Sequence, residues 1–271
     1  MKKFLVIGNP IAHSLSPKLF TLFFKKLDLH DYLYEKFLIT NIHELEMFVS
    51  RLDNDVAGFN VTSPYKVEII KYLDYLDSSV INTNNCNCVK IINNRLYGYN
   101  TDYFGFKSLI NYYSLNFNNC DIVILGSGGT AHTLTALLLK EYSSNIYIYS
   151  RNNITSLKLI DFSSKYINKK NSVSQFKIDN QIDCSKSIII NCTTDRNIHC
   201  NNFFNNNIPI KKCKLFIDLN YNFNKNQKYI NGNTMFIYQA IQSLNIWFDK
   251  KLLSKFKITE LIKELSQNEE N

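Results

Sequence analysis

A glycine-rich turn between an expected strand and an expected helix is the strongest chemical signal in this sequence. Asp121–Leu125 is a short apolar run rich in β-branched residues, and the letters GSGGTA at positions 126–131 follow it directly. In this G-x-G-x-x-A pattern, Gly126 permits a tight turn, Gly128 lets a pyrophosphate approach the backbone, and Ala131 lets the helix pack closely. The N–H groups at the helix start would bind the phosphates. The pattern favours a dinucleotide site; the alternative is a plain βα turn that holds no ligand.

The end of the next expected strand, at residues 146–149, refines this reading. An NAD site usually has an acid there, about 20 residues past the loop, which binds the ribose hydroxyls. Here the strand ends in Ser150, Arg151 and Asn152, with no acid. A guanidinium suits the planar, doubly charged 2′-phosphate of NADP. The pattern therefore favours NADP, and the alternative is an ordinary solvated arginine.

A lysine near the end of another expected strand is a candidate proton donor. Residues 56–61 form this strand, and the turn that leaves it carries Thr62 and Lys66. Ligands of parallel α/β sheets lie outside the carboxyl ends of the strands, where Asn60, Thr62 and Lys66 all fall. A lysine in a partly closed cleft can act as a general acid or base. The alternative is a lysine at a helix start that faces solvent.

An aspartate lies at the end of an expected β-hairpin. Residues 85–89 and 96–99 form its strands, and Asn93-Asn94 forms its turn. The second strand leads to Asp102. A buried aspartate there could hold a neighbouring ammonium charged or share its proton. The alternative is that Asp102 is the N-cap of a helix that begins at Tyr103.

Two serines lie two positions apart in a turn before a helix. Ser14 and Ser16 precede Pro17, which suits a first helical position. One interpretation is that Ser16 is the helix cap and nothing more. The other is that both hydroxyls bind one acceptor, because a carboxylate is favoured near a helix N-terminus. The sequence leaves both open.

These candidate residues have to be positioned by alternating strands and helices. Further strands are expected at residues 4–8, 32–38, 188–190 and 215–221, and helices at residues 42–52 and 235–248, with a charged amphipathic helix after them. Strands that alternate with helices at this spacing predict a mainly parallel α/β sheet. The chain of 271 residues is long enough for two modest domains.

Composition narrows the class of protein. A hydrophobic content of 45% and a charged content of 20% are typical of a globular protein, and the longest apolar runs are too short to cross a bilayer. The net charge of +8 is scattered rather than arranged in a basic stripe, which argues against a nucleic-acid partner. The seven cysteines include no C-x-x-C pair, and His199-Cys200 has no second ligand pair, so we expect reduced thiols, no metal and a cytoplasmic location.

Three segments taken together resemble the shikimate dehydrogenase family. They are IGNPIAHSLSP at residues 7–17, GFNVTSPYK at residues 58–66, and NTD at residues 100–102. Their order and spacing fit this family along almost the full length of the chain. The resemblance implies an enzyme that reversibly reduces 3-dehydroshikimate to shikimate with NADPH, in the pathway to chorismate and the aromatic amino acids.

The resemblance also implies roles for individual residues. Lys66 and Asp102 would be the catalytic pair. Substrate would be bound by these two together with Ser14, Ser16, Thr62, Asn87, Tyr221 and Gln239. The cofactor would be bound by Gly126, Ser127, Gly128, Gly129, Thr130, Ser150, Arg151, Asn152, Leu219 and Gly232.

The expected fold has two α/β domains. Residues 1–102 plus 238–271 would form a mainly parallel substrate-binding catalytic domain, to which the C-terminal helices return. Residues 103–237 would form a Rossmann-type NADP-binding domain. The expected partner is the small-molecule substrate, with no nucleic acid and no membrane, and the protein would be a monomer or a homodimer.

Two alternative functions stay open at this point. A quinate/shikimate dehydrogenase that uses NAD or NADP would need the same groups. A nucleotide-binding regulator that has lost catalysis would keep the glycine turn, although intact Lys66 and Asp102 argue against it.

Overall fold

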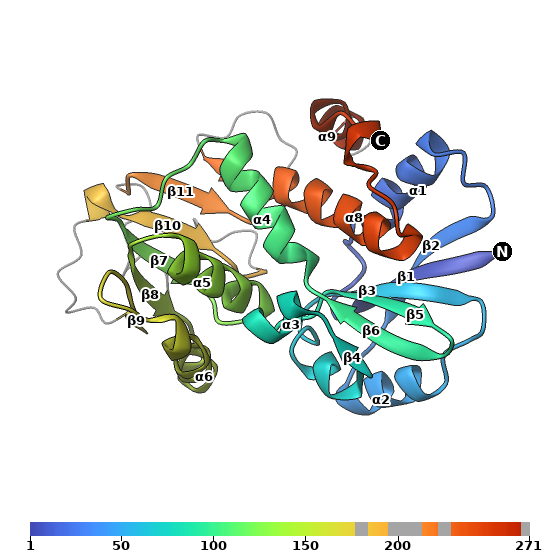
Figure 1. The fold of residues 1–271 in the computed structure, drawn as a ribbon, viewed down its shortest axis with the longest axis horizontal. Helices are drawn as coiled ribbons and strands as arrows, with labels where there is room; N and C mark the ends of the chain where they lie inside the picture. The colour runs from blue at the N-terminus through green and yellow to red at the C-terminus, as the bar shows by residue number, and fades with distance from the viewer. Residues whose placement is uncertain (177–183, 195–212, 222–228, 267–271) are drawn as a thin grey trace. The chain divides into compact units, whose positions relative to one another are not determined.

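The chain divides into two compact units, each built on its own six-stranded sheet (Figure 1). In the computed structural model of the protein, residues 1–176, 184–194, 213–221 and 229–266 are described. The first unit comprises Met1–Gly105 and Ile237–Asn271, and the second comprises Phe106–Phe236. Within the described ranges, no helix is both long enough and apolar enough to cross a membrane.

The sheet of the first unit is mixed. Its strands are β1 (Lys2–Gly8), β2 (Tyr32–Leu38), β3 (Val56–Val61), β4 (Tyr75–Leu76), β5 (Cys88–Ile92) and β6 (Arg95–Tyr99), in the order β2-β1-β3-β5-β6-β4. Strand β1 pairs in parallel with β2 and β3, and β4 pairs in parallel with β6. The hairpin β5–β6 supplies the antiparallel pairs, β3 with β5 and β5 with β6. The expected hairpin turn is confirmed: Asn93 and Asn94 both have positive φ, as a tight two-residue turn requires.

Helices cover both faces of this sheet, and strand β1 is therefore buried on both sides. The helices that contribute to this unit are α1 (Ser16–Lys26), α2 (Ile42–Ser50), α3 (Ser78–Thr83), α4 (Thr101–Tyr112), α8 (Asn233–Phe248) and α9 (Ile258–Ser266). Leu5 on β1 belongs to the same core cluster as Leu45 on α2. On the opposite face, the Phe4 ring stacks on Trp247 of α8 with centroids 4.3 Å apart. The predicted return of the C-terminal helices to the first sheet is therefore confirmed.

The sheet of the second unit is parallel throughout. Its strands are β7 (Asp121–Leu125), β8 (Asn145–Tyr149), β9 (Ser172–Gln175), β10 (Ile188–Asn191), β11 (Leu215–Asp218) and β12 (Ile230–Asn231), in the order β12-β11-β10-β7-β8-β9. Read from the β9 edge, the described strands follow the 3-2-1-4-5-6 order of the doubly wound dinucleotide-binding fold. The order reverses between β7 and β10, and helices α5 (Gly129–Glu141) and α6 (Asn153–Ser163) follow β7 and β8. The predicted Rossmann-type sheet is confirmed.

The second unit buries a histidine side chain. His132 on α5 is 6% exposed, and its Nδ1 has no hydrogen-bond partner among the described residues. Its ring lies 5.7 Å from the ring of Phe162, centroid to centroid. Burial lowers the pKa of His132 from 6.5 to about 4, because a charged imidazolium would lose its hydration there.

We predict that His132 contributes to acid denaturation. Its folded pKa lies below its unfolded value, so the unfolded chain binds the proton first. Stability is full above about pH 6.5 and falls as pH drops toward about 4, by about 3 kcal/mol in total. The free energy of unfolding, measured in urea at several pH values, should depend less steeply on pH in His132→Leu than in the wild type. An unchanged slope would contradict the prediction, and exposed His43→Leu is the matched control.

Candidate functional site

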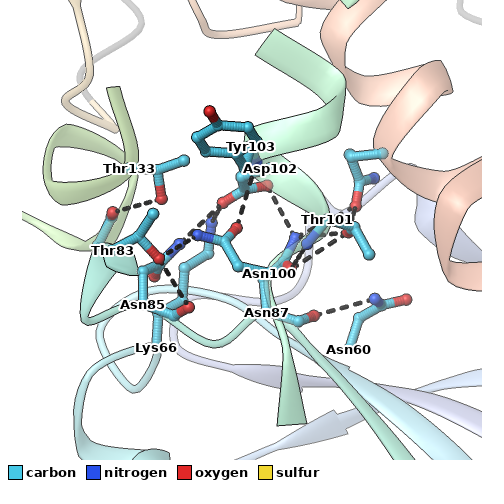
Figure 2. A network of polar contacts seen from close by, with 12 residues as sticks. Asn60, Lys66, Thr83, Asn85, Asn87, Asn100, Thr101, Asp102, Tyr103 and Thr133 are labelled. Atoms are coloured by element: carbon cyan, nitrogen blue, oxygen red, sulfur yellow. Dashed lines mark hydrogen bonds and ion pairs between the residues drawn. The ribbon is translucent and has the colours of Figure 1, made fainter. Parts of the chain in front are cut away.

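A shielded ion pair joins two segments of the first unit (Figure 2). Lys66 Nζ donates to Asp102 Oδ2 at 2.6 Å, and the two side chains are 15% and 7% exposed. Lys66 lies in the turn after β3, and Asp102 lies in the first turn of α4. The ammonium and the carboxylate that we selected from the sequence thus meet in space. An ammonium and a carboxylate in such a place can move a proton to or from a bound oxygen.

Two asparagine amides hold the Asp102 carboxylate in place (Figure 2). Asn87 Nδ2 donates to Asp102 Oδ1 at 2.8 Å, and Asn85 Nδ2 makes a longer contact of 3.4 Å with Oδ2. Asn87 is itself fixed, because its Oδ1 accepts the backbone N–H of Thr101 at 2.7 Å. The amides therefore orient the carboxylate toward Lys66.

Asp102 is not a helix cap. Helix α4 begins at Thr101, so Asp102 is inside its first turn. The residue that accepts a backbone N–H at this end is Asn100, whose Oδ1 lies 3.3 Å from the nitrogen of Tyr103. The N-cap alternative for Asp102 is wrong, because its carboxylate is engaged by Lys66 and the two amides.

The cap alternative for Ser16 is also wrong. Ser16 is the first residue of α1, and the N-cap position belongs to Leu15, which has no side-chain oxygen. Ser14 compensates, since its Oγ accepts the backbone N–H of Ser16 at 3.3 Å. Both serines therefore lie at the N-terminus of an 11-residue helix. Such an end favours an anion, so the carboxylate-binding role remains a prediction.

The other predicted substrate residues fall in both units. Gln239 of α8 joins the cluster around Asp102, because its Oε1 accepts from Asn87 Nδ2 at 3.4 Å and from Thr101 Oγ1 at 3.3 Å. Thr62 lies in the same turn as Lys66. Tyr221 belongs to the second unit, where its ring lies 4.3 Å from that of Phe236.

Two cysteine thiols flank Asn87 without offering a nucleophile. Cys86 and Cys88 are fully buried. Burial raises the pKa of the Cys86 thiol to about 12 and raises the pKa of the Cys88 thiol as well. Both thiols are therefore neutral near pH 7. The described residues also contain no group of three or more histidine, cysteine, aspartate or glutamate side chains able to hold a metal ion.

The glycine turn of the second unit has the geometry that a phosphate needs. Gly126 has φ of +102°, which side-chain-bearing residues rarely adopt. Gly128 is the N-cap of α5, and a Cβ added to it would meet nothing within 4 Å. Gly129 and Thr130 open the helix, and Ala131 is fully buried. A ligand can therefore approach the backbone at Gly128 and the first N–H groups of α5.

A hydroxyl-rich cluster lies at the end of β8. Ser127 Oγ is 2.9 Å from Ser150 Oγ and 2.6 Å from Thr155 Oγ1. Asn152 caps α6, since its Oδ1 accepts the backbone N–H groups of Ile154 and Thr155. Arg151 is exposed, and no hydrogen bond or ion pair engages its guanidinium within the described part of the chain. The arginine is therefore available to an anionic ligand.

Asp218 organises the ends of β10 and β11, and our sequence analysis missed it. It is buried, and its Oδ1 accepts from Asn191 Nδ2 at 2.9 Å and from the backbone N–H of Asn220 at 3.1 Å. These bonds fix the turn that carries Leu219. The available signal was a set of polar residues at the carboxyl ends of two neighbouring parallel strands.

Gly232 has a packing role that the sequence did not indicate. A Cβ added to Gly232 would lie 2.1 Å from the carbonyl oxygen of Leu219. The two residues that the resemblance places at the cofactor therefore touch each other through their backbones. Only glycine permits this approach.

Comparison with known proteins identifies the family. Residues 6–89 match the family model described as the shikimate dehydrogenase substrate binding domain. Over 260 residues the chain is 35% identical to the shikimate dehydrogenase (NADP(+)) of Methanococcus maripaludis strain C6, which covers 91% of each chain. The chain belongs to the shikimate dehydrogenase family. It is also 32% identical to the shikimate dehydrogenase (NADP(+)) of Staphylococcus aureus strain bovine RF122 / ET3-1, over 92% of this chain and 93% of that one.

Solved structures of the shikimate dehydrogenase family share the fold. A shikimate dehydrogenase crystallised in complex with NADP+ superposes with a TM-score of 0.78 at 29% identity, over 99% of this chain and 96% of that one. Shikimate dehydrogenase 1 from Peptoclostridium difficile superposes with a TM-score of 0.76 at 26% identity, over 98% of each chain.

Gly128 and Gly232 should respond differently to an added methyl group. Gly128→Ala places its Cβ in open space, so the free energy of unfolding should change by less than about 0.5 kcal/mol. Gly232→Ala drives its Cβ against the Leu219 carbonyl and should lose at least about 1–3 kcal/mol. Urea denaturation of both variants measures the difference. Equal losses in the two variants would contradict the assignment of Gly128 to an open ligand-facing position.

Proposed function

We propose that this protein is an NADP-dependent shikimate dehydrogenase, which reversibly reduces 3-dehydroshikimate to shikimate. The observation that carries the proposal is the shielded Lys66–Asp102 pair, in a chain whose relatives are shikimate dehydrogenases. A regulator without catalysis would have no need to keep an ammonium and a carboxylate together in a largely buried place, where both lose hydration.

Substrate binding and cofactor binding would be assigned to different units. The first unit, with the ion pair and the serines of α1, would bind the substrate. The second unit, with the glycine turn and the doubly wound sheet, would bind NADP. In the shikimate dehydrogenase solved with NADP+, the cofactor accompanies the same overall fold.

The substrate has a carboxylate and ring hydroxyls, and the first unit offers a donor for each. Ser14 and Ser16, at the N-terminus of α1, would hold the carboxylate. The hydroxyls would be bound by Thr62, Asn87 and the catalytic pair, with Gln239 and Tyr221 as further contacts. Asn87 and Gln239 already share one hydrogen-bonded cluster with Asp102, which supports their assignment.

The residues of the second unit fit NADP. The open approach to Gly128 suits a pyrophosphate, which the backbone from Gly126 to Thr130 would bind. The exposed Arg151, between Ser150 and Asn152, would bind the 2′-phosphate. Leu219 would lie near the nicotinamide, and the backbone of Gly232 would contact the cofactor. When bound, the cofactor supplies or accepts the hydride.

Lys66 would move the proton. In the reducing direction, Lys66 donates a proton from Nζ to the substrate oxygen as negative charge develops on it. In the oxidising direction, Lys66 accepts that proton. Asp102 holds Nζ at 2.6 Å and balances its charge, while Asn87 keeps the carboxylate oriented.

Removing the lysine should abolish most of the turnover. In Lys66→Ala, kcat for NADPH formation from shikimate should fall by about 10²- to 10⁴-fold, because the proton transfer loses its catalyst, while substrate affinity changes little. Absorbance of NADPH measures the rate. Lys71→Ala is the matched control, since Lys71 is an exposed lysine close by in the sequence. Near-wild-type turnover in Lys66→Ala would overturn the mechanism, and parallel assays with quinate would show whether that acid is also a substrate.

Removing the arginine should reduce the preference for NADP. In Arg151→Ala, KM for NADP+ should rise by about tenfold to a hundredfold, because a charge-assisted contact to the 2′-phosphate is lost. KM for NAD+ should not rise, since NAD+ has no such phosphate. Steady-state kinetics with each cofactor measures both values, with Arg95→Ala as the control. A parallel rise for both cofactors would contradict the assignment.

A further inference from the structure

A buried tyrosine hydroxyl is connected to the substrate site by hydrogen bonds. Tyr34 on β2 is 6% exposed, and its hydroxyl donates to Asn60 Oδ1 at 2.8 Å. The Tyr34 ring stacks on Phe20 of α1, with centroids 4.1 Å apart and planes 6° from parallel. The stacking fixes the ring, so the hydroxyl has a defined direction. None of the expected roles includes this tyrosine.

Asn60 connects the Tyr34 hydroxyl to two further groups. It lies on β3 and is 7% exposed. Its Nδ2 donates to the backbone carbonyl of Asn87 at 3.0 Å and to Ser243 Oγ at 3.0 Å (Figure 2 shows the first of these contacts). If the amide turned over, Oδ1 would face the Asn87 carbonyl, and two acceptors would repel each other. The donor from Tyr34 favours the orientation in which both Nδ2 contacts are made.

The two acceptors of Asn60 belong to the segments that carry substrate residues. The Asn87 carbonyl is bound by Asn60 and also by the backbone N–H of Val61 at 2.9 Å. Ser243 is buried on α8, and its hydroxyl donates to the carbonyl of Gln239, one turn earlier, at 3.1 Å. Asn60 therefore joins the Asn87 segment to the helix turn of Gln239.

We propose that Tyr34 is a positioning residue of the substrate site, and that it acts through Asn60 on Asn87 and Gln239. This inference rests on the proposed function, which gives those two residues to the substrate. Tyr34 fixes the orientation of the Asn60 amide, and the amide fixes the distance between the Asn87 segment and α8. This distance sets the geometry in which Asn87 and Gln239 contact the substrate hydroxyls.

Tyr34→Phe tests the inference, because it removes the hydroxyl and keeps the ring stacked. KM for shikimate and the Kd of shikimate from calorimetry should rise about threefold to tenfold, the effect of one hydrogen bond. KM for NADP+ and kcat should stay at the wild-type values, since the lost contact supports substrate binding in the ground state and transition state alike. A structural role alone would lower the melting temperature without this selective rise.

Ser243→Ala provides a second route to the same link. It removes one acceptor of Asn60 with a small change of volume, and should raise KM for shikimate in the same selective way. The double variant should be no worse than the poorer single variant, because both changes act through one amide. Tyr32→Phe is the matched control: it lies on the same strand, and no hydrogen bond of its hydroxyl occurs within the described residues.

Three outcomes would overturn the inference. The first is an unchanged KM and Kd for shikimate in folded Tyr34→Phe. The second is an equal rise in KM for shikimate and for NADP+. The third is additive effects on KM for shikimate when Tyr34→Phe and Ser243→Ala are combined. Assays of the wild-type protein distinguish a failure of this inference from a failure of the proposed function. A wild type that neither binds nor oxidises shikimate would overturn the proposed function, and the inference with it.

Discussion

The ion pair between Lys66 and Asp102 is the interaction on which the first unit depends. An ammonium and a carboxylate taken out of water lose hydration, and only close pairing with further hydrogen bonds offsets the loss. The structure provides both, through the 2.6 Å contact and the amides of Asn85 and Asn87. Leaving either charge alone there would cost about 3–5 kcal/mol. The surrounding segments are therefore constrained to bring the two groups together.

Each sheet positions a different set of polar side chains. In the first, the β5–β6 hairpin places Asn87 just before β5 and leads from β6 directly into α4, which carries Asp102. In the second, the reversal of strand order between β7 and β10 leaves the carboxyl ends of these strands bordered by the glycine turn and the Asn191–Asp218 contact. Polar side chains thus collect where strands end, and apolar ones fill the strands themselves.

Much of this organisation was predictable from the sequence, because periodicity and turn chemistry are local. The bounds of β2, β3 and β7 agree with the expected ranges, and the resemblance indicated that Lys66 and Asp102 act as a pair. The sequence left a capping role open for Ser16 and for Asp102. The structure excludes it, because Leu15 occupies the N-cap position of α1 and Asn100 accepts the backbone N–H at the start of α4. Tyr34 was missed because its partner Asn60 lies on another strand, and Asp218 was missed because its partner Asn191 lies on a neighbouring strand.

The stacking of Phe4 on Trp247 has a consequence for biogenesis. Phe4 on β1 also packs against Phe24 and Tyr32, but Trp247 becomes available to it only after the second unit has been synthesised. The second unit, Phe106–Phe236, is an insertion between these two parts and is finished earlier. Because domains generally fold as units while the chain emerges, the inserted unit can mature first. Strand β1, which is synthesised before the second unit, then completes its core after it.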